Sequence, residues 1–593
     1  MKIYKIFLIF ISSVGFISCQ ADLSLKTDNS YGDELTWSLP HKAEGVLLQA
    51  YVDIMTQPDN WAGNNFLDVA TDNAVTNDFT SGLYQLTAGG ITPHNNPIEN
   101  WTTAYLKFQY IHLFLENGLK SDIIYDLNDP ARDISIRTRL KGEAYFLRAW
   151  WGFDLLQKYG GLTDEGEALG YPIVLKNVTN TSELNSLIRN TYEECVRQIS
   201  NDCDSAIKYL PNSYLGTDAI IGETQTGRAS GKAAYALKSR LYTYAASPAF
   251  QPSGISDGEI HDKWIRAVHS SSQAIEDGLI GNYTGLTEAD FAGPGLRNIT
   301  PDEFLFRTWI NNNAMETRNF PPVFFGMGKT NPSQNLVNSF PMINGYPITD
   351  SRSGYDPQAP YNNRDKRLDL TVYYHGQIFN SSRPLEIAVD EEGNPGRDAA
   401  GYEYRNTRTG YYLRKWLSSK NNMLFDPSLL TAVNDFHQYP LLRRSEVYFN
   451  LAEALNESVG PMGVVENVPY TAVSIINNVR NAAGITSTTY VDEVASMGKE
   501  AFRNLILNER RIEFAFENMR YFDLRRWLLP LNESVNGIRI VQNETGLIFE
   551  GTNPIEAPLV VEKRLLNDEK YYYSPISYEE IIKNPNLIQN KGW

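Results

Sequence analysis

The chain has 593 residues, of which 42% are hydrophobic and 12% aromatic, and its formal net charge at pH 7 is −17. A chain of this length and composition can bury a large core and is expected to contain several parts. The acidic balance, without a long run of Lys or Arg, argues against nucleic acid as a partner, because phosphate groups require a basic surface.

The first residues have the pattern of a targeting segment. Lys2 and Lys5 precede an apolar run over 6–17, which is too short to span a bilayer and ends at a small residue before Cys19. This pattern is typical of a bacterial lipoprotein signal, with cleavage before Cys19 and a lipid on its thiol. We therefore expect a signal peptide over 1–18 and a protein anchored to a membrane rather than spanning it. An ordinary secretory peptide with an incidental Cys is the alternative.

Apolar residues then recur at helical spacing in several segments. The segments expected to form helices are 42–55, 101–118, 136–159, 186–210, 231–246 and 262–278. The last two carry small residues, such as Ala236 and Ala267, where paired helices would approach closely, as in tetratricopeptide repeats. Cys195 and Cys203 lie eight residues apart on one predicted helix, about 12 Å, which is too far for a disulfide. We expect two free structural thiols and no metal site.

Two long stretches lack this periodicity. The first is an Asn-rich loop over 57–97, and the second, over 279–435, is rich in Gly, Pro, Asn and Tyr. The second stretch contains strand candidates at 303–309 and 371–374 and a polar turn at 390–396 that lacks the ligand spacing of a calcium loop. Long ordered loops often carry binding sites. Helical periodicity returns over 439–457, 471–483 and 499–517.

The helix predicted over 499–517 carries Glu509 and Glu513 on its apolar face. The two carboxylates would lie about 6 Å apart, near the spacing found in retaining glycosidases. Catalytic carboxylates usually come from different elements across a cleft, whereas buried carboxylates on one face require cationic partners. Arg444 shares a face with the apolar residues of the helix predicted over 441–455, so we expect it to form a buried ion pair with Glu509 or Glu513.

Several segments resemble the SusD/RagB family. The strongest are 141–161 (KGEAYFLRAWWGFDLLQKYGG) and 508–527 (NERRIEFAFENMRYFDLRRW). Others are 331–350 (NPSQNLVNSFPMINGYPITD), 361–376, 410–416 (GYYLRKW) and 440–456 (PLLRRSEVYFNLAEALN). The similarity runs from about residue 40 to residue 593 in the order of the family.

This resemblance implies a mainly α fold, in which tetratricopeptide-like helix pairs form a scaffold and a loop-rich insertion with a few short strands carries the ligand site. It implies an outer-membrane lipoprotein at the cell surface, which binds oligosaccharides and delivers them to a SusC-like TonB-dependent transporter. Some members bind peptides instead, and a glycoside hydrolase is a third, less favoured hypothesis. No catalysis and no cofactor are expected.

The expected parts of the chain follow from these observations. They are the signal peptide over 1–18, a lipid anchor and tether over 19–40, an N-terminal helical scaffold over 41–278 with its long loop at 57–97, an irregular ligand-binding lobe over 279–435, and a C-terminal helical part over 436–593 that packs on the scaffold.

Candidate ligand-binding residues are those in the two loop regions that suit a sugar. Aromatic rings stack on the apolar face of a pyranose, and planar polar groups bind its hydroxyls. The candidates are Trp61, Asp72 and Tyr84 in the first loop and Trp309, Asn311, Asn312, Phe324 and Phe325 in the second region. Burial in loop packing is the alternative for each.

Overall fold

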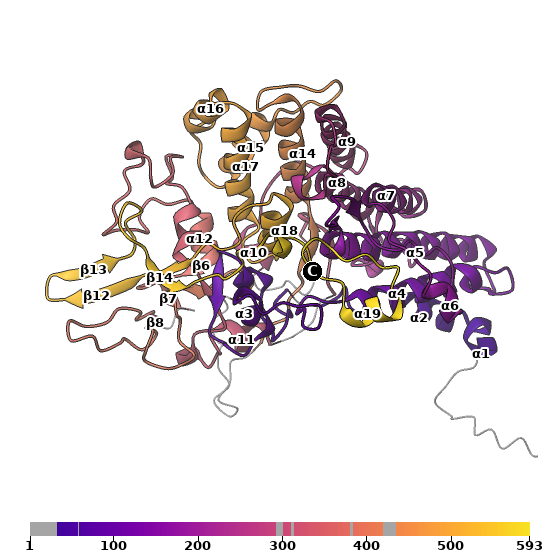
Figure 1. Ribbon diagram of the computed structural model, residues 1–593, viewed down its shortest axis with the longest axis horizontal. Helices are drawn as coiled ribbons and strands as arrows, with labels where there is room; N and C mark the ends of the chain where they lie inside the picture. The colour runs from indigo at the N-terminus through magenta and orange to yellow at the C-terminus, as the bar shows by residue number, and fades with distance from the viewer. Residues whose placement is uncertain (1–32, 57, 292–300, 310–313, 380–382, 419–433) are drawn as a thin grey trace, which may run out of the picture.

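The computed structural model describes residues 33–56, 58–291, 301–309, 314–379, 383–418 and 434–593. The protein is mainly helical, as expected, and its strands are short. Figure 1 shows a curved array of helices on one side and a lobe of loops and short hairpins on the other. Among the residues described, no helix combines the length and the apolar character needed to cross a membrane.

The scaffold is a row of helices in which each packs on the next along the chain. Its members are α2 (Pro40–Leu48), α4 (Trp101–Leu113), α5 (Pro130–Tyr159), α7 (Tyr192–Tyr209), α8 (Gly231–Ala246) and α9 (Asp257–Glu276). Ala236 and Ala267 are fully buried, and Ser239 and Ser271 share a hydrogen bond of 2.8 Å between α8 and α9. Small residues therefore do bring these two helices close together.

Polar caps determine where two of these helices begin. The hydroxyl of Thr191 and the carboxylate of Glu194 form a reciprocal capping box, so α7 begins at Tyr192, later than the apolar pattern indicated. Ser256 and Glu259 cap α9 in the same way, so that helix begins earlier, at Asp257. A capping box satisfies free backbone N–H groups, and it outweighs apolar spacing at a helix end.

The second helical group packs on α8 and α9 through α14. It contains α14 (Arg444–Val459), α15 (Ala472–Ala482), α16 (Thr489–Ser496), α17 (Lys499–Glu513) and α18 (Met519–Arg526). The helix predicted over 499–517 ends early, because Phe516 and Asn518 have φ angles of 58° and 61°. The predicted start of the preceding helix, at 439, is also wrong, because a strand occupies 440–443.

Each strand in the described residues pairs antiparallel with a single partner. The pairs are β1 (Ala74–Thr76) with β5 (Thr330–Pro332), β2 (Gly161–Leu162) with β3 (Ala168–Leu169), β4 (Phe304–Arg307) with β10 (Pro440–Arg443), β6 (Val372–Tyr373) with β9 (Tyr412–Leu413), β7 (Ile378–Phe379) with β8 (Arg383–Pro384), β11 (Val535–Gly537) with β14 (Leu559–Glu562), and β12 (Arg539–Asn543) with β13 (Gly546–Glu550). The last two pairs correct the expectation that 436–593 is helical throughout.

Short helices lie within the first loop and the lobe. They are α3 (Gly82–Thr87), α11 (Met315–Asn319), α12 (Gln334–Ser339) and α13 (Arg367–Thr371). The β1–β5 pair joins the first loop to the lobe, although more than 250 residues separate the two strands in the chain. The two loop regions expected to carry the ligand site are therefore neighbours in space.

The end of the chain returns to the first loop. Backbone N–H groups of Leu565 and Tyr578 donate to the carbonyls of Thr87 and Pro93 at 2.9 and 3.0 Å. The guanidinium of Arg564 donates to three further carbonyls of this loop, those of Val69, Thr71 and Ala74. The loop is thus held by the C-terminal segment.

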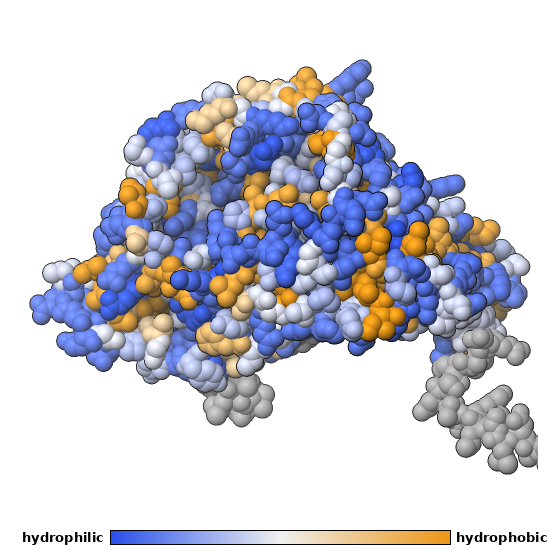
Figure 2. Space-filling model, viewed as in Figure 1, coloured by the Kyte–Doolittle hydropathy of each residue, from blue (hydrophilic) through white to orange (hydrophobic). Residues whose placement is uncertain are grey.

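The C-terminal helix α19 (Tyr578–Lys583) lies on the molecular surface. Figure 2 shows hydrophobic residues gathered over the position of α19, on a face that is otherwise largely hydrophilic. The exposed side chains at this end of the molecule include Ile582 and Ile588, and the carbonyl of Ile588 accepts a hydrogen bond from Arg189. Exposed apolar groups that gather in this way are typical of contact surfaces.

Candidate functional site

Glu509 and Glu513 form the centre of a buried ionic network. Only 1% and 6% of the two residues is exposed. Arg367 contacts Glu509 at 2.6 Å and Glu513 at 3.4 Å, and Arg443 contacts Glu513 at 3.1 Å. Burial disfavours the charged form of Glu513, but Arg443 and Arg367 outweigh it and lower the pKa of this carboxyl. Two enclosed, ionised carboxylates do not face each other across a cleft, so this pair supports the structural hypothesis rather than the hydrolase.

The cation that reaches Glu513 from this part of the chain is Arg443, so the prediction of Arg444 is wrong. The guanidinium of Arg444 instead donates to the carbonyls of Asn282 and Asp302, both at 3.0 Å. The physical reason is the short strand β10, which runs to Arg443 and gives way to α14 at the next residue. A face assigned by helical spacing from 441 therefore selected the wrong neighbour.

Asp72, a predicted ligand residue, is corrected to a structural role. It is buried, and its carboxylate accepts two hydrogen bonds of 2.9 Å from Arg520 and lies 3.0 Å from Arg511. Burial opposes ionisation, but the two guanidinium groups hold the pKa of Asp72 well below its usual range. Asp72 thus ties the first loop to α17 and α18, and is not free for a sugar hydroxyl.

The two tryptophans among the predicted ligand residues lie apart. Trp61 is half-buried, with the ammonium group of Lys158 5.2 Å from its ring. Trp309 is exposed and its ring centroid lies 6.0 Å from that of Tyr51, whose hydroxyl donates to Glu143. Lys158 and Glu143 are both on α5, 15 residues apart, or about 22 Å along the helix. Trp61 and Trp309 therefore do not form one site.

Cys19, Asn311 and Asn312 lie outside the described residues. The remaining candidates, Tyr84, Phe324 and Phe325, lie in two segments that meet a third. The contact is made by one side chain, the amide of Asn77. Its Nδ2 donates to the carbonyls of Met327, Gly328 and Arg405, at 2.8, 2.9 and 2.6 Å. The segments 77–84, 324–329 and 402–408 are therefore fixed to one another at this point.

These three segments each expose an aromatic ring. Phe79 is 55% exposed, Phe325 is 37% exposed and Tyr404 is 84% exposed. We refer to these three residues as the aromatic platform. Phe79 is supported edge-on by Tyr84, with ring centroids 5.1 Å apart, and the guanidinium of Arg408 lies 4.6 Å from its ring. Large apolar rings held open to solvent on a fixed frame are the groups that stack on a sugar.

Phe325 has an unusual backbone. Its φ of 63° places it in the left-handed region, directly after the short turn Pro322–Phe324. That region disfavours bulky side chains, and such a residue costs about 1–3 kcal/mol. Strain of this kind is kept where it serves a purpose, and here it accompanies a partly exposed ring.

Polar groups surround the platform. Lys329 contacts Asp78 at 3.3 Å, and Arg408 donates to the carbonyl of Thr76 at 2.7 Å. The guanidinium of Arg405 lies 5.5 Å from the ring of Tyr404. Ammonium, guanidinium and carboxylate groups at the edge of a ring can hydrogen-bond the hydroxyls of a stacked sugar.

The sequence prediction missed Phe79 and Tyr404. A signal for Phe79 exists, because it lies among turn-forming residues: the backbone N–H of Thr80 donates to the carboxylate of Asp78 at 3.1 Å. A large apolar side chain at a polar turn is solvent-exposed unless another segment covers it. Tyr404, between Glu403 and Arg405, has the same kind of surroundings.

A larger cleft lies on the scaffold, between the α7–α8 connection and β4. Its volume is about 840 Å³, and its lining includes Tyr214, Arg228, Lys232, Asp302, Phe304 and Arg307. This volume suits a ligand pocket, but Phe304 and Tyr214 are buried and Arg228 is paired with Glu143 at 2.9 Å. The cleft thus offers polar groups without an exposed aromatic face. Over the described part of the chain, no group of three His, Cys, Asp or Glu side chains is placed to hold a metal ion.

Family models and known proteins agree with this architecture. A model described as "SusD family" matches residues 307–593, and one described as "Starch-binding associating with outer membrane" matches residues 25–243. The curated SusD-like protein P2 of Formosa agariphila is 29% identical over 155 residues, which are 26% of this chain. The chain spans about a quarter of that relative's length, as the match covers 25% of it.

Solved structures show the same fold. A SusD-like protein from Bacteroides fragilis has a TM-score of 0.72 and 22% identity, covering 95% of this chain and 99% of its own. A SusD-like carbohydrate binding protein from the same organism has a TM-score of 0.67 and 21% identity, covering 93% and 99%. The two family models together extend over most of the helical scaffold, the lobe and the C-terminal segment. The chain is therefore a member of the SusD family.

Proposed function

We propose that this protein is a lipid-anchored, surface-exposed binding protein of the outer membrane, which captures an oligosaccharide on the aromatic platform and delivers it to a SusC-like TonB-dependent transporter. The observation that carries the glycan assignment is the platform itself, in which Phe79, Phe325 and Tyr404 come from three segments fixed together by Asn77. The similarity to a protein described as carbohydrate binding supports the same ligand class. Catalysis is not part of the proposal, because Glu509 and Glu513 are consumed by arginine pairs.

The size of the platform bears on the ligand. If a sugar covers about 40 Å² of each ring, each contact contributes about 1 kcal/mol at 25 cal/mol per Å². Three such contacts and a few hydrogen bonds give weak binding after the entropy lost on association is subtracted. An open surface of this kind favours a ligand of several sugar units over a single ring, because each added unit brings its contacts without a second loss of that entropy.

Affinity gel electrophoresis of the lipid-free protein, from residue 21 onward, tests the ligand class against a panel of soluble polysaccharides. We expect one polysaccharide to retard the protein without loss of polymer. Phe79→Ala and Tyr404→Ala are expected to abolish the retardation, because each removes a stacking ring. Tyr578→Ala is the matched control, since Tyr578 is an exposed aromatic residue on α19, away from the platform.

Two results would contradict the platform assignment. Retardation that survives both platform variants but is lost in Trp309→Ala would move the site to the scaffold cleft. Retardation by no polysaccharide, together with binding of a peptide library, would replace the glycan by a peptide ligand.

The anchor and the location have a separate test. In the native host, Cys19→Ser is expected to move the protein from the membrane fraction to the soluble fraction and to remove labelling by a radioactive fatty acid. Protease added to intact cells is expected to cleave the wild-type protein. A Cys19→Ser protein that stays in the membrane fraction would contradict the anchor.

A further inference from the structure

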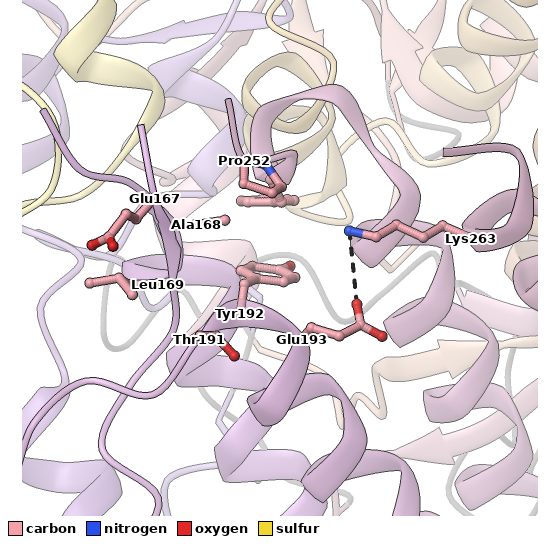
Figure 3. Close-up of a pocket in the computed structure, with 9 residues that line it drawn as sticks. Glu167, Ala168, Leu169, Thr191, Tyr192, Glu193, Pro252 and Lys263 are labelled. Carbon is pink, nitrogen blue, oxygen red and sulfur yellow. Dashed lines mark ion pairs between the residues drawn. The ribbon is translucent and has the colours of Figure 1, made fainter. Parts of the chain in front are cut away.

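A small pocket lies in the helical scaffold, formed by elements that take no part in the platform. Its volume is about 260 Å³, and it lies between the β2–β3 turn, the start of α7 and the helix α9. The lining that matters here is Leu169, Tyr192, Glu193, Phe250, Pro252 and Lys263. Figure 3 shows the ring of Tyr192 between Leu169 and the Glu193–Lys263 ion pair, with its hydroxyl end turned toward that pair.

Two buried polar atoms of this pocket lack a hydrogen-bond partner in the protein. One is the hydroxyl of Tyr192, a residue that is only 2% exposed, and the other is Oε2 of Glu193. Lys263 Nζ lies 3.8 Å from this Oε2, which is an ionic contact but too long for a hydrogen bond. Buried polar groups are nearly always paired, so two exceptions that face one cavity indicate that a ligand completes them.

The charges around the pocket balance. Oε1 of Glu193 accepts a hydrogen bond of 2.6 Å from Arg266, and Lys263 donates to the side chain of Gln251 at 2.9 Å. Glu167 is the second carboxylate in the lining. Two cations beside two carboxylates leave little net charge, so the site does not favour an ionic ligand.

The walls are apolar and flat. The rings of Tyr192 and Phe250 stack with centroids 4.7 Å apart and planes at 15°. Leu169 and Phe250 are both buried, and Pro252 completes this side. The backbone at the end of α5 leaves space for the Tyr192 ring, because a Cβ at Gly160 would lie 2.7 Å from its Cε2. The stacked rings therefore form a firm wall.

We propose that this pocket binds one neutral, sugar-sized polyol, such as a single monosaccharide unit, as a site distinct from the platform. A ring hydroxyl donates to Oε2 of Glu193, and another exchanges a hydrogen bond with the hydroxyl of Tyr192 or accepts one from Lys263. The apolar C–H groups of the ring lie on the apolar wall. A volume below the usual 300–1,000 Å³ of ligand pockets admits one ring and excludes a chain.

Ligand-observed NMR with D-glucose, D-galactose, D-xylose and myo-inositol, each at millimolar concentration, tests this proposal on the lipid-free protein. We expect at least one of the four to bind, and we expect Tyr192→Phe to weaken that binding at least tenfold. This change removes only an unpaired hydroxyl, so the variant is expected to melt no lower than the wild type. The matched control is Tyr242→Phe, whose hydroxyl bonds Ser200 at 2.9 Å outside the pocket.

Three results would overturn the proposal: binding of none of the four compounds, equal binding by wild type and Tyr192→Phe, or loss of binding in the platform variant Tyr404→Ala. The last result would show that single sugars bind at the platform instead. Conversely, a Tyr404→Ala protein that loses polysaccharide but keeps the monosaccharide separates the two sites, so the pocket and the proposed function succeed or fail independently.

Discussion

Replacing Arg443 by Met is expected to destabilise the protein more than the same change at its neighbour Arg444. Arg443 donates to Glu303, Glu513 and Glu517 at 3.0, 3.1 and 2.9 Å, and it is almost fully buried. Arg444 contacts carbonyl oxygens. The two variants thus compare the loss of a buried countercharge with the loss of ordinary hydrogen bonds at adjacent positions.

The magnitude follows from what each carboxylate retains in Arg443→Met. Glu513 keeps Arg367 at 3.4 Å and Glu517 keeps Lys415 at 2.7 Å. Glu303 keeps only neutral donors, such as the N–H of Ser445 at 2.9 Å. One uncompensated buried charge costs about 3–5 kcal/mol.

In Arg444→Met, two carbonyls lose a charged donor, at a cost of about 1–2 kcal/mol. Thermal unfolding followed by circular dichroism at pH 7 measures the difference. For a chain of this length we expect midpoint decreases of about 3 °C for Arg443→Met and about 1 °C for Arg444→Met. Arg443→Lys serves as a control that keeps the charge but not the planar fork, and it is expected to lie between wild type and Arg443→Met.

An Arg444→Met midpoint as low as that of Arg443→Met, or an Arg443→Met midpoint equal to wild type, would refute this reasoning.

Three further predictions concern other residues. Phe325→Gly is expected to abolish polysaccharide retardation and to raise the unfolding free energy by about 1 kcal/mol, because Gly accepts a positive φ without strain; a lower stability would contradict this. Burial disfavours charge on His437, but Glu316 at 2.6 Å outweighs it and raises the pKa of His437, so this stabilisation is full below pH about 6.5 and is lost as the pH rises through the raised pKa. The thermal midpoint is therefore expected to fall over that pH range in wild type and less in His437→Gln, and equal slopes would contradict it. Burial raises the pKa of Cys195 to about 12 and also raises that of Cys203, so at pH 8 neither is expected to react with Ellman's reagent until guanidinium unfolds the protein; fast reaction of the folded protein would contradict this.

The helices could be predicted where burial follows one face of a single element. The helix α8 has the bounds that apolar spacing indicated, because its two ends coincide with a Ser cap and a Pro-containing turn. The strand β10 could not be predicted in this way. It is four residues long and owes its conformation to pairing with β4, which lies more than 130 residues earlier. Non-local pairing leaves no local periodicity, and the choice between Arg443 and Arg444 depended on it.

The candidate site was predicted in part for a similar reason. Residue type identifies what suits a sugar, but exposure depends on which distant segment covers each residue. Asp72 has suitable chemistry and is covered by Arg511 and Arg520 from α17 and α18. Phe325 has suitable chemistry and stays open. The Arg cluster of 510–526 was read as an ion-paired or solvated face, and its partner in the first loop was the information that the sequence did not carry.

The return of the C-terminal segment to the first loop also determines when the platform can form. Arg408, which lies against Phe79, contacts Glu562, and Arg564 holds the carbonyls of the first loop. Contacts between residues so far apart in the chain form only when both have been synthesised. Ribosomes and export machinery deliver the residues near 79 first and those near 564 last, so the surface is assembled after the chain has been released. A chain that stops before residue 562 would thus carry every aromatic ring of the platform, yet lack the contacts that hold them in register.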